Sequence, residues 1–374
     1  MKITTSGESH GKGLVAVIEG LPAGLTLDPD AIDRALALRQ SGYGRGARQK
    51  IEKDSAEIVS GVRNLKTLGS PLTLLVKNAD YENWAAHMAP EGCDEETRKL
   101  TKVRPGHADL PGMMKFRQSD ARNILERASA RETAARVAAG EVCRQLLKEL
   151  GVEITGYVRS VGIIEGSGSF TFDEIKNKRG ENLLMMKRER EAMQYIDACG
   201  KAGDTCGGVI ELRVRGLKYG FGSCMTYAEK LDARLCAALM SVQAIKGVEV
   251  GLGFRVATRR GSEAHDELYV SGGQIFHKTN RAGGIEGGMS NGEEIVLRAA
   301  MKPIPTLMKG LNTVDTADMT AAQAATERSD VCAIAACEVV LESAICAELT
   351  AVVLERLGGD TVFEIKERYG RLPS

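Results

Sequence analysis

The sequence predicts a mixed α/β fold in which short strands pack on long helices. Three observations lead to this fold class. The 374 residues are 43% hydrophobic, which is enough for one large core. Apolar residues repeat at i, i+4 spacing after Thr133, as on an amphipathic helix, whereas residues 207–216 alternate as a strand does. A Glu-Arg pair also precedes a long helical stretch twice, at Glu126-Arg127 and Glu327-Arg328. We therefore hypothesise one domain, residues 1–374, with two internally related halves, about 1–155 and 156–374.

The first half is predicted to contain strands at residues 2–5, 14–18, 57–62 and 71–76, and a short helix at 30–38. Residues 78–102 are polar and irregular and hold the only tryptophan, Trp84, which favours a lid or a surface excursion. The half closes with an amphipathic helix of about six turns, which begins after Ser129 and ends before Gly151.

The second half is predicted to contain strands at 152–165, 207–216, 248–256 and 293–301, and helices at 183–198, 228–245 and 331–357. Ser329 or Asp330 is placed to cap the last helix. Residues 272–292 are dense in glycine, and a glycine-rich loop of this length is more often functional than structural.

The start of the first long helix carries an unusual charge pattern. Ser129 and Glu132 have the spacing of a capping box, in which each side chain bonds the other residue's amide. Four arginines surround this helix start, where the helix dipole is already positive: Arg122, Arg127, Arg131 and Arg136. We favour an anion site here. In the alternative interpretation, Glu126 and Glu132 neutralise two of these arginines in surface pairs.

Two further features indicate a site for small anions. Arginines and glycines alternate over residues 39–48, so that backbone amides and guanidinium groups can close on one anion. His10 and His107 each lie in a glycine-flanked turn, as paired proton donors can. Either histidine alone is more simply a turn residue. Together they indicate a reaction in which arginines hold an anionic leaving group and a histidine protonates it.

The net charge, the cysteine pattern and the lengths of the apolar runs argue against several other classes of protein. Fifty basic and 50 acidic side chains give a formal net charge of zero, which argues against a general nucleic-acid partner. The nine cysteines have no metal-ligand spacing and indicate reduced thiols in a cytoplasmic protein, so we expect no metal. No apolar run is long enough for a membrane span, and the N-terminus lacks a signal-peptide pattern.

Six motifs together resemble the chorismate synthase family and follow its order along almost the whole chain. They are Gly-Glu-Ser-His-Gly at 7–11, Arg-Gln-Ser-Gly-Tyr-Gly-Arg-Gly at 39–46, Arg-Pro-Gly-His-Ala-Asp at 104–109, Arg-Ala-Ser-Ala-Arg-Glu-Thr at 127–133, Asn-Arg-Ala-Gly-Gly-Ile-Glu-Gly-Gly-Met-Ser-Asn-Gly at 280–292 and Arg-Ser-Asp at 328–330. Each motif alone is weak, whereas the set is specific.

The resemblance implies a phospho-lyase that converts 5-enolpyruvylshikimate 3-phosphate to chorismate and phosphate by 1,4-anti elimination with reduced FMN. It implies that His10 protonates the leaving phosphate, that His107 acts near the flavin N1, and that Asp330 with Ser9 handles the N5 proton. The implied flavin-binding residues are Arg127, Ala128, Ser129, Gln243, Ala244, Gly287, Lys302, Pro303, Ile304, Pro305, Thr306 and Arg328. The residues implied for the substrate anions, or for NADP, are Arg39, Arg45, Arg48, Arg104 and Arg131.

The resemblance also implies a β-α-β sandwich with mostly antiparallel sheets, a homotetramer in the cytoplasm, and a role in aromatic amino acid biosynthesis through the shikimate pathway. Some members reduce their own flavin with NADPH, but this chain has no added module for it, so an external flavin reductase is the expected partner. Two alternatives stay open from the residues: an FMN-dependent oxidoreductase acting on a small phosphorylated anion, and a non-catalytic RNA-binding protein that uses the Arg39–Arg48 loop.

Overall fold

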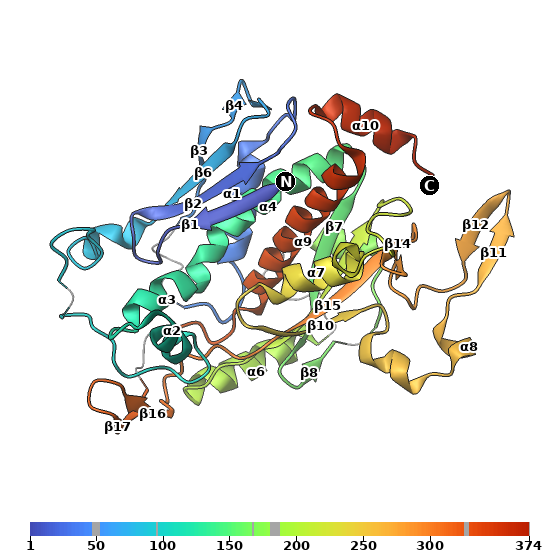
Figure 1. Cartoon of the computed structure of the whole chain (residues 1–374). Coiled ribbons are helices and arrows are strands. Elements are labelled where there is room, and N and C mark those ends of the chain that lie inside the picture. The colour runs from blue at the N-terminus through green and yellow to red at the C-terminus, as the bar shows by residue number, and fades with distance from the viewer. Residues whose placement is uncertain (47–52, 95, 167, 180–187, 325–328, 374) are drawn as a thin grey trace.

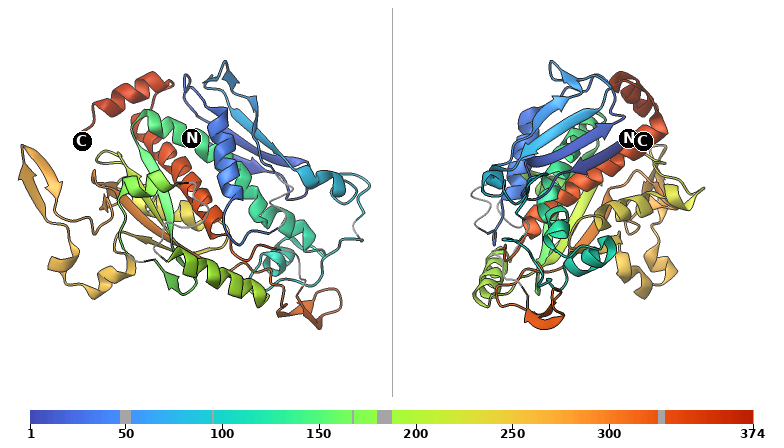
Figure 2. Two further views of the ribbon diagram at one scale, coloured as in Figure 1. Left: turned by 180° about the vertical axis from the view of Figure 1, so that it is seen from behind. Right: turned by 60° about the vertical axis from the view of Figure 1, so that its left-hand side comes forward.

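Two antiparallel sheets enclose two long helices, α4 (Thr133–Glu149) and α9 (Ile334–Leu357), and the three layers form a β-α-β sandwich (Figure 1). The structure is a computed structural model and describes residues 1–374 except 47–52, 95, 167, 180–187, 325–328 and 374. The predicted α+β class and its sandwich architecture are confirmed. Figure 2 shows the helix layer between the sheets from two further sides.

The first sheet covers α4, and α1 (Pro29–Gln40) packs on α4 and α9. Its strand order is β1 (Lys2–Ser6), β2 (Gly13–Glu19), β6 (Leu72–Lys77) and β3 (Glu57–Ser60), and every neighbouring pair is antiparallel. Strand β2 alternates between buried and half-buried side chains because one face lies on the helices.

The second sheet lies on α9. Its strand order is β10 (Ile245–Val250), β15 (Ile295–Met301), β9 (Gly208–Arg215), β7 (Glu153–Val161) and the short β8 (Ile164–Glu165), again antiparallel throughout. Helix α7 (Leu231–Met240) joins β9 to β10 and packs on both α9 and β10.

The two sheets share one strand order. With the short edge strand β8 left out and the strands numbered along the chain within each half, both sheets read 1-2-4-3, with a helix between the second and third strands and a long helix after the fourth. The edge strands β3 and β10 even carry a register shift at similar places. This common order supports the hypothesis of two related halves, which stays a prediction.

The remaining described helices and strands lie outside the two main sheets and the two long helices. The helices are α2 (Asp109–Phe116), α3 (Arg122–Ala128), α5 (Phe172–Lys178), α6 (Glu189–Lys201), α8 (Gly261–Ala264) and α10 (Val362–Gly370). The strands are β4 (Val62–Arg63), β5 (Lys66–Thr67), β11 (Leu268–Ser271), β12 (Gln274–His277), β13 (Ile285–Glu286), β14 (Met289–Ser290), β16 (Asn312–Asp315) and β17 (Thr320–Gln323). Within the described part of the chain, no helix combines the length and the apolar character needed to cross a membrane.

The core is one large cluster between the sheets and the helices, with a small satellite around α2 and α3. The predicted apolar stripe of the first long helix lies in the large cluster, where Ala134, Ala138, Val142 and Leu146 are all buried. The helices α4 and α9 cross closely at Gly140, because a Cβ there would lie 2.5 Å from the Cβ of Ser343.

Because neighbouring strands run in opposite directions, successive connections lie at opposite ends of the sandwich. In the first half, the connections 7–12, 41–56 and 78–132 reach the end at which α4 begins. In the second half, the matching connections 162–207, 241–244 and 302–333 reach the end at which α9 begins. These two ends meet, because residues of the connections from both halves hydrogen-bond to one another. We call this the helix-start end.

Four local predictions were wrong. Ser129 caps only the 3-10 turn η3 (Ala130–Glu132) by accepting from the amide of Arg131, and the Glu132 side chain turns elsewhere, so no capping box forms. The helix α4 has 17 residues, about five turns instead of six. The helix predicted at 228–245 ends at Met240, and Ile245 opens β10. The helix α9 has Ala333 at its cap position, without a side-chain cap from Ser329 or Asp330.

Candidate functional site

The turn that carries His10 connects β1 to β2 and is fixed by glycine and by α3. Gly7 has φ +102°, and a Cβ there would lie 2.2 Å from the carbonyl oxygen of Gly13, so only glycine fits. The amide of Ser9 donates to the carbonyl oxygen of Glu126 at 2.8 Å. Ser9 itself is buried in this turn.

Glu126 orients the imidazole of His10. Its carboxylate lies 2.8 Å from Nδ1 of His10 and accepts the His10 amide at 2.8 Å. Burial acts to raise the pKa of Glu126, but the bonds and charges of His10 and Arg122 outweigh it and hold the pKa below its usual value. Because a carboxylate only accepts, Nδ1 of His10 carries the hydrogen, and Nε2 is the nitrogen that can exchange protons.

An aromatic ring from the irregular segment 78–102 covers His10. The indole of Trp84 stacks on the imidazole with 3.9 Å between the ring centroids. The guanidinium groups of Arg98 and Arg122 lie over the same indole at 3.8 and 5.0 Å from its centroid. The segment 78–102 therefore packs against a predicted catalytic residue, as a lid would.

His107 has the same kind of carboxylate partner. Its Nδ1 lies 2.5 Å from Oδ1 of Asp109, which is fully buried at the start of α2. Arg104 also binds Asp109, through Nε at 2.8 Å and Nη2 at 3.0 Å. Burial would raise the pKa of Asp109, but the bonds from His107 and Arg104 hold it far below the usual value. Asp109 is therefore ionised and fixes the side chains of His107 and Arg104.

Three predicted substrate arginines form a buried cluster. Arg39, at the end of α1, and Arg131, before α4, both bind Asp54, at 2.8 and 2.6 Å. Arg45 binds Asp330 at 3.0 Å, and Oδ1 of Asp330 also accepts the Gly46 amide at 2.6 Å. Within the described residues, Nε of Arg39 and Nε of Arg45 are buried without a hydrogen-bond partner. Burial lowers the pKa of both groups, against the opposing effect of their aspartates. Two unsatisfied donors in a cationic cluster suit an incoming anion.

Asn78 joins the arginine cluster to the His10 turn. Its side-chain amide donates to the carbonyl oxygens of Glu8 and Gly11 at 3.0 and 2.8 Å, and its oxygen accepts from Nε of Arg131 at 2.9 Å. The side chain is buried. The predicted proton donor and the predicted anion site are thus held by one residue.

Two residues predicted to hold the flavin, Arg127 from the first half and Gln243 from the second, lie beside Glu132. Arg127 donates to the carbonyl oxygens of Thr5 and Gly7 and lies 3.6 Å from Glu132. Gln243 donates to Glu132 at 3.0 Å, while its own Oε1 is buried without a partner among the described residues. Ala244 follows with φ +70°, an unusual conformation for alanine, and its carbonyl oxygen accepts the Lys302 amide at 2.9 Å.

The segment Lys302–Thr306 connects this region to His107. The ammonium group of Lys302 bonds to the carbonyl oxygen of Gly106, and Arg104 donates to Thr306 at 3.4 Å. Thr205 donates to the carbonyl oxygen of Ile304 at 2.7 Å and fixes the middle of the segment. Pro303 and Pro305 stiffen it. The turns of His10 and His107 thus belong to one hydrogen-bonded region at the helix-start end.

Some predicted residues lie elsewhere or cannot be placed. Gly287 is in the β13–β14 hairpin, in the connection from β10 to β15, which leads to the opposite end of the sandwich. The hairpin contacts the start of α7 through Leu231, whereas Gln243 follows the end of that helix. A single chain does not bring Gly287 to the other candidates. Arg48 and Arg328 fall outside the described residues. Ala128 ends α3 and Ser129 follows it, both beside Arg127.

Two of the four arginines at the helix start pair with glutamates. Arg122 faces Glu126, and Arg136 pairs with Glu132 at 3.0 Å, as in the alternative interpretation, except that both glutamates are buried instead of lying at the surface. The anion site at this helix start stays a prediction. Burial would raise the pKa of Glu132, but Arg136, Gln243 and Thr5 keep it low. Of the four, Arg131 alone joins the buried arginine cluster.

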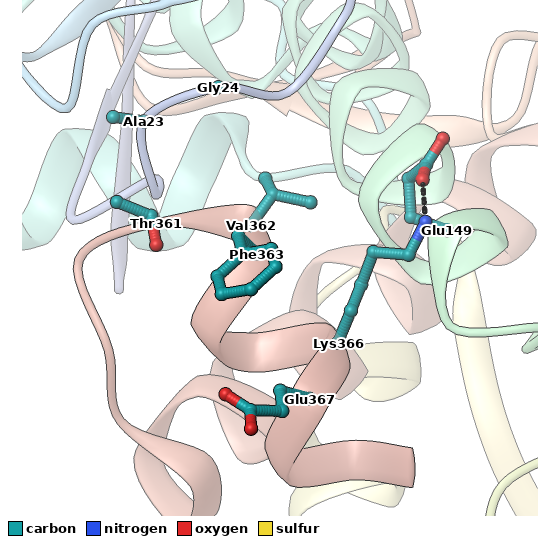
Figure 3. A pocket seen from close by; sticks show the side chains of 8 residues that line it. All are labelled: Ala23, Gly24, Glu149, Thr361, Val362, Phe363, Lys366 and Glu367. Carbon is teal, nitrogen blue, oxygen red and sulfur yellow. Dashed lines mark hydrogen bonds and ion pairs between the residues drawn. The ribbon is translucent and has the colours of Figure 1, made fainter.

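A cavity of about 730 Å³ lies at the opposite end of the molecule (Figure 3). Its lining residues are Ala23, Gly24, Glu149, Thr361, Val362, Phe363, Lys366 and Glu367. The ion pair between Lys366 and Glu149, 2.6 Å, occupies its only lysine. The residues that line the cavity include no histidine or arginine and none of the predicted site residues.

Several residues that organise this site had no predicted role in it. Asp109 could have been found from sequence, because it lies two positions after His107 in the same motif. Glu126 was expected only as a neutralising charge, and Trp84 only as part of a lid or surface excursion. Asp54 and Asn78 give no local signal, since both bind Arg131, which is distant from them in sequence.

Comparisons with known proteins agree on one family. The family model described as "Chorismate synthase" matches residues 1–354. A protein named chorismate synthase from Pelobacter propionicus is 51% identical over 383 residues, covering 99% of this chain and 97% of that protein. One from Caldicellulosiruptor bescii is 47% identical over 379 residues, covering 100% and 99%. A solved structure titled "Crystal Structure of Chorismate Synthase" superposes with a TM-score of 0.79 at 38% identity, covering 99% of this chain and 96% of that one.

Proposed function

The chain belongs to the chorismate synthase family, and we propose that its reaction takes place among the residues gathered at the helix-start end. The chain is a lyase that converts 5-enolpyruvylshikimate 3-phosphate to chorismate and phosphate. The observation that carries the site assignment is the hydrogen-bonded connection of His10, His107, the arginine cluster and Lys302–Thr306 at one end of the fold.

We propose that reduced FMN is the cofactor, and the residues present fit it. The Oε1 atom of Gln243 is buried without a partner within the described residues, and Ala244 is held in a strained conformation beside Lys302. Arg127, Ala128, Ser129 and Lys302–Thr306 would complete the flavin site. When bound, reduced FMN supplies electron density that weakens the bond to the leaving phosphate, and there is no net redox change.

Different side chains of this protein would carry out different parts of the elimination. Arg39, Arg45 and Arg131 would bind the phosphate and carboxylate groups of the substrate, with Arg104 at the edge of the cluster near Thr306. His10, fixed at Nδ1 by Glu126, would deliver a proton from Nε2 to the leaving phosphate. His107, fixed by Asp109, would balance charge on the flavin side. The indole of Trp84 would keep water away from His10.

Asp330 and Ser9 were expected to act together on the flavin N5 proton. In the described structure, Ser9 lies beside Glu126 and Asp330 lies beside Arg45 and Gly46. Both would act as proton-handling groups, and Asp330 would in addition position Arg45.

We propose a cytoplasmic homotetramer that depends on an external flavin reductase. The hairpin β11–β12 supports self-association, since it projects from the body (Figures 1 and 2) and exposes Leu268, Tyr269, Val270 and Ile275. An assignment of Gly287 to the flavin site requires a second copy of the chain, because its hairpin is remote from Gln243.

An anaerobic assay tests the function. Protein, 5-enolpyruvylshikimate 3-phosphate and photoreduced FMN are mixed, and phosphate and chorismate are measured. Equal release of both, with FMN catalytic, is expected. An FMN-dependent oxidoreductase would instead consume NAD(P)H in step with product. An RNA-binding protein would show steeply salt-dependent RNA affinity, which the buried state of Arg39 and Arg45 already disfavours.

A further inference from the structure

The indole of Trp84 lies between two planar groups. It stacks on the imidazole of His10, with 3.9 Å between the ring centroids and an interplanar angle of 23°. The guanidinium carbon of Arg98 lies 3.8 Å from the centroid of the same indole. Two flat groups this close to one ring centre would overlap on a single face, so they occupy opposite faces. The order is therefore imidazole, indole, guanidinium, with Trp84 as the middle layer.

Hydrogen bonds within its own segment hold the indole in place. Trp84 directly follows the 3-10 helix η2 (Ala79–Asn83). Its Nε1 donates to Oδ2 of Asp80 at 3.1 Å, while the side-chain amide of Asn83 donates to Oδ1 of the same carboxylate at 2.9 Å. Arg98 donates in turn to the carbonyl oxygen of Asn83 at 3.4 Å. The indole is thus fixed along one edge and on its outer face.

The stack closes into a ring of contacts through α3. Glu126 lies 2.8 Å from Nδ1 of His10 and 3.5 Å from Nη1 of Arg122. Nε of Arg122 donates to the carbonyl oxygen of Arg98 at 2.6 Å, and its guanidinium carbon lies 5.0 Å from the indole centroid of Trp84. These five residues therefore form a closed circuit, in which a shift of one member disturbs its neighbours on both sides.

The contacts at the edge and on the face together determine how the imidazole of His10 is oriented. The carboxylate of Glu126 bonds the ring at Nδ1 alone, so the ring plane could still tilt about that atom. The nearly parallel indole of Trp84 removes this freedom. Exclusion of water from His10 needs only apolar bulk above the ring, whereas a fixed orientation needs a flat face beside it.

We propose that Trp84 is a positioning residue for proton delivery by His10. The inference rests on the proposed function, because it takes His10 as the donor to the leaving phosphate. Held by Asp80 and Arg98, the indole keeps the imidazole plane and therefore the direction of Nε2. Proton transfer requires a donor–acceptor distance of about 2.6–3.2 Å, and a misplacement of about 1 Å can cost 10²-fold in rate. Trp84 should therefore act on kcat, since the arginine cluster would bind the substrate.

Three variants separate the orientation of His10 from the exclusion of water. Trp84→Phe keeps a flat aromatic face, whereas Trp84→Leu keeps apolar bulk without such a face. Phe254→Leu makes a comparable change at an aromatic residue that is 81% exposed, and it serves as the control. Phosphate release is measured at steady state, anaerobically and with saturating photoreduced FMN, and urea unfolding is measured for each variant.

We expect Trp84→Leu to lower kcat by about 10- to 100-fold, as for other partners of functional histidines, while KM stays nearly unchanged. Trp84→Phe should recover most of the lost kcat, and Phe254→Leu should match the wild type. A wild-type kcat in Trp84→Leu, an equal loss in Trp84→Phe, or a rise in KM that accounts for the whole loss would each overturn the role of Trp84. Absence of phosphate release from the wild type would instead overturn the proposed function itself.

The emission of Trp84, the only tryptophan of the chain, tests the stack without substrate or cofactor. An imidazole ring in contact with an indole quenches its emission, so His10→Ala should raise the emission intensity. His87 lies at the edge of the same indole, with 6.2 Å between the ring centroids, and His87→Ala is the matched control with a smaller expected change. Equal emission from His10→Ala and the wild type would show that the two rings are not stacked. That result would overturn the proposal even if Trp84→Leu failed to fold.

Discussion

His10 and Glu126, 116 residues apart in the chain, are joined by two hydrogen bonds of 2.8 Å, one to the imidazole Nδ1 and one to the backbone amide. The carboxylate therefore fixes both the ring and the turn that carries it. Asp109 does the same for the ring of His107. The two proposed proton carriers share one arrangement, in which a carboxylate bonds Nδ1 and Nε2 would transfer the proton.

The Glu126–His10 contact predicts the effect of Glu126→Gln. The amide keeps the shape but loses the charge, so turnover should fall roughly 10- to 100-fold, as for other partners of functional histidines. Because the pKa of Glu126 is lowered in the folded state, its stabilising effect is complete above the unfolded value of about 4.3 and disappears as the pH falls through the folded value. Urea unfolding should thus show the variant closer to the wild type at about pH 3 than at pH 7. An equal difference at both values would contradict the ion pair.

Replacing either proposed proton carrier should reduce turnover without loss of fold. His10→Ala and His107→Ala should each lower turnover by about 10²-fold or more while FMN still binds. The exposed His265 provides the control, and His265→Ala should match the wild type. Phosphate release and flavin fluorescence titration measure the two quantities. A histidine whose removal leaves turnover near normal has no part in the mechanism.

The shared carboxylate of Arg39 and Arg131 should be essential for stability. Asp54→Asn leaves two buried guanidinium groups without their counter-charge, so the free energy of unfolding should fall by about 3–5 kcal/mol. The exposed pair of Glu267 and Lys278 is the comparison, and Glu267→Gln should change stability by less than about 1 kcal/mol. Similar small effects in both variants would show that Asp54 does not hold the arginines together.

Asn78 should affect catalysis through the His10 turn and Arg131, which its side chain binds. Asn78→Ala removes three bonds that hold the His10 turn and Arg131, so we expect a lower kcat and a higher KM together. Stability should drop by about 1–3 kcal/mol as buried partners lose their bonds. Steady-state kinetics with urea unfolding would separate the effects. A stability loss with unchanged kinetics would make Asn78 a purely structural residue.

Between α4 and α9, the carboxyl groups of Glu338 and Glu342 lie close together near Arg144 and Arg179. Burial and the nearby Glu342 raise the pKa of Glu338 well above its usual value. Burial also acts to raise the pKa of Glu342, but the two arginines outweigh it and lower that pKa to about 2. Because the pKa of Glu338 is raised in the folded state, the contribution of this group to stability is complete below the pKa of the unfolded state. It declines as the pH rises through the pKa of the folded state.

Two neutral variants of this pair should therefore behave oppositely. Glu338→Gln should remove that decline and be more stable than the wild type at alkaline pH. Glu342→Gln should lose about 3–5 kcal/mol, because it removes the buried carboxylate that Arg144 and Arg179 share. Urea midpoints from about pH 5 to pH 9 measure both. If Glu338→Gln followed the wild-type pH profile, the two carboxyls would not share a proton.

Periodicity predicted the strands and long helices of the frame because each buries one face in the core. It failed where distant residues decide the local structure. Glu132 leaves its capping position because Thr5, Arg136 and Gln243 bind it. The helix α7 stops short because Ala244 adopts a positive φ to reach Lys302. The cationic and imidazole groups of the site could be found from sequence, but their carboxylate partners Glu126 and Asp54 could not, as both are contributed by segments far along the chain.

The common strand order of the two sheets has an evolutionary consequence. Imidazoles and most anion-binding guanidinium groups come from the first repeat, whereas Lys302–Thr306 and Asp330 come from the second. If the repeats descend from a duplicated gene, the ancestral protein had one copy of each connection and would have formed such a site only between two paired subunits. Fusion then freed each copy to specialise, one toward proton transfer and the other toward holding a coenzyme.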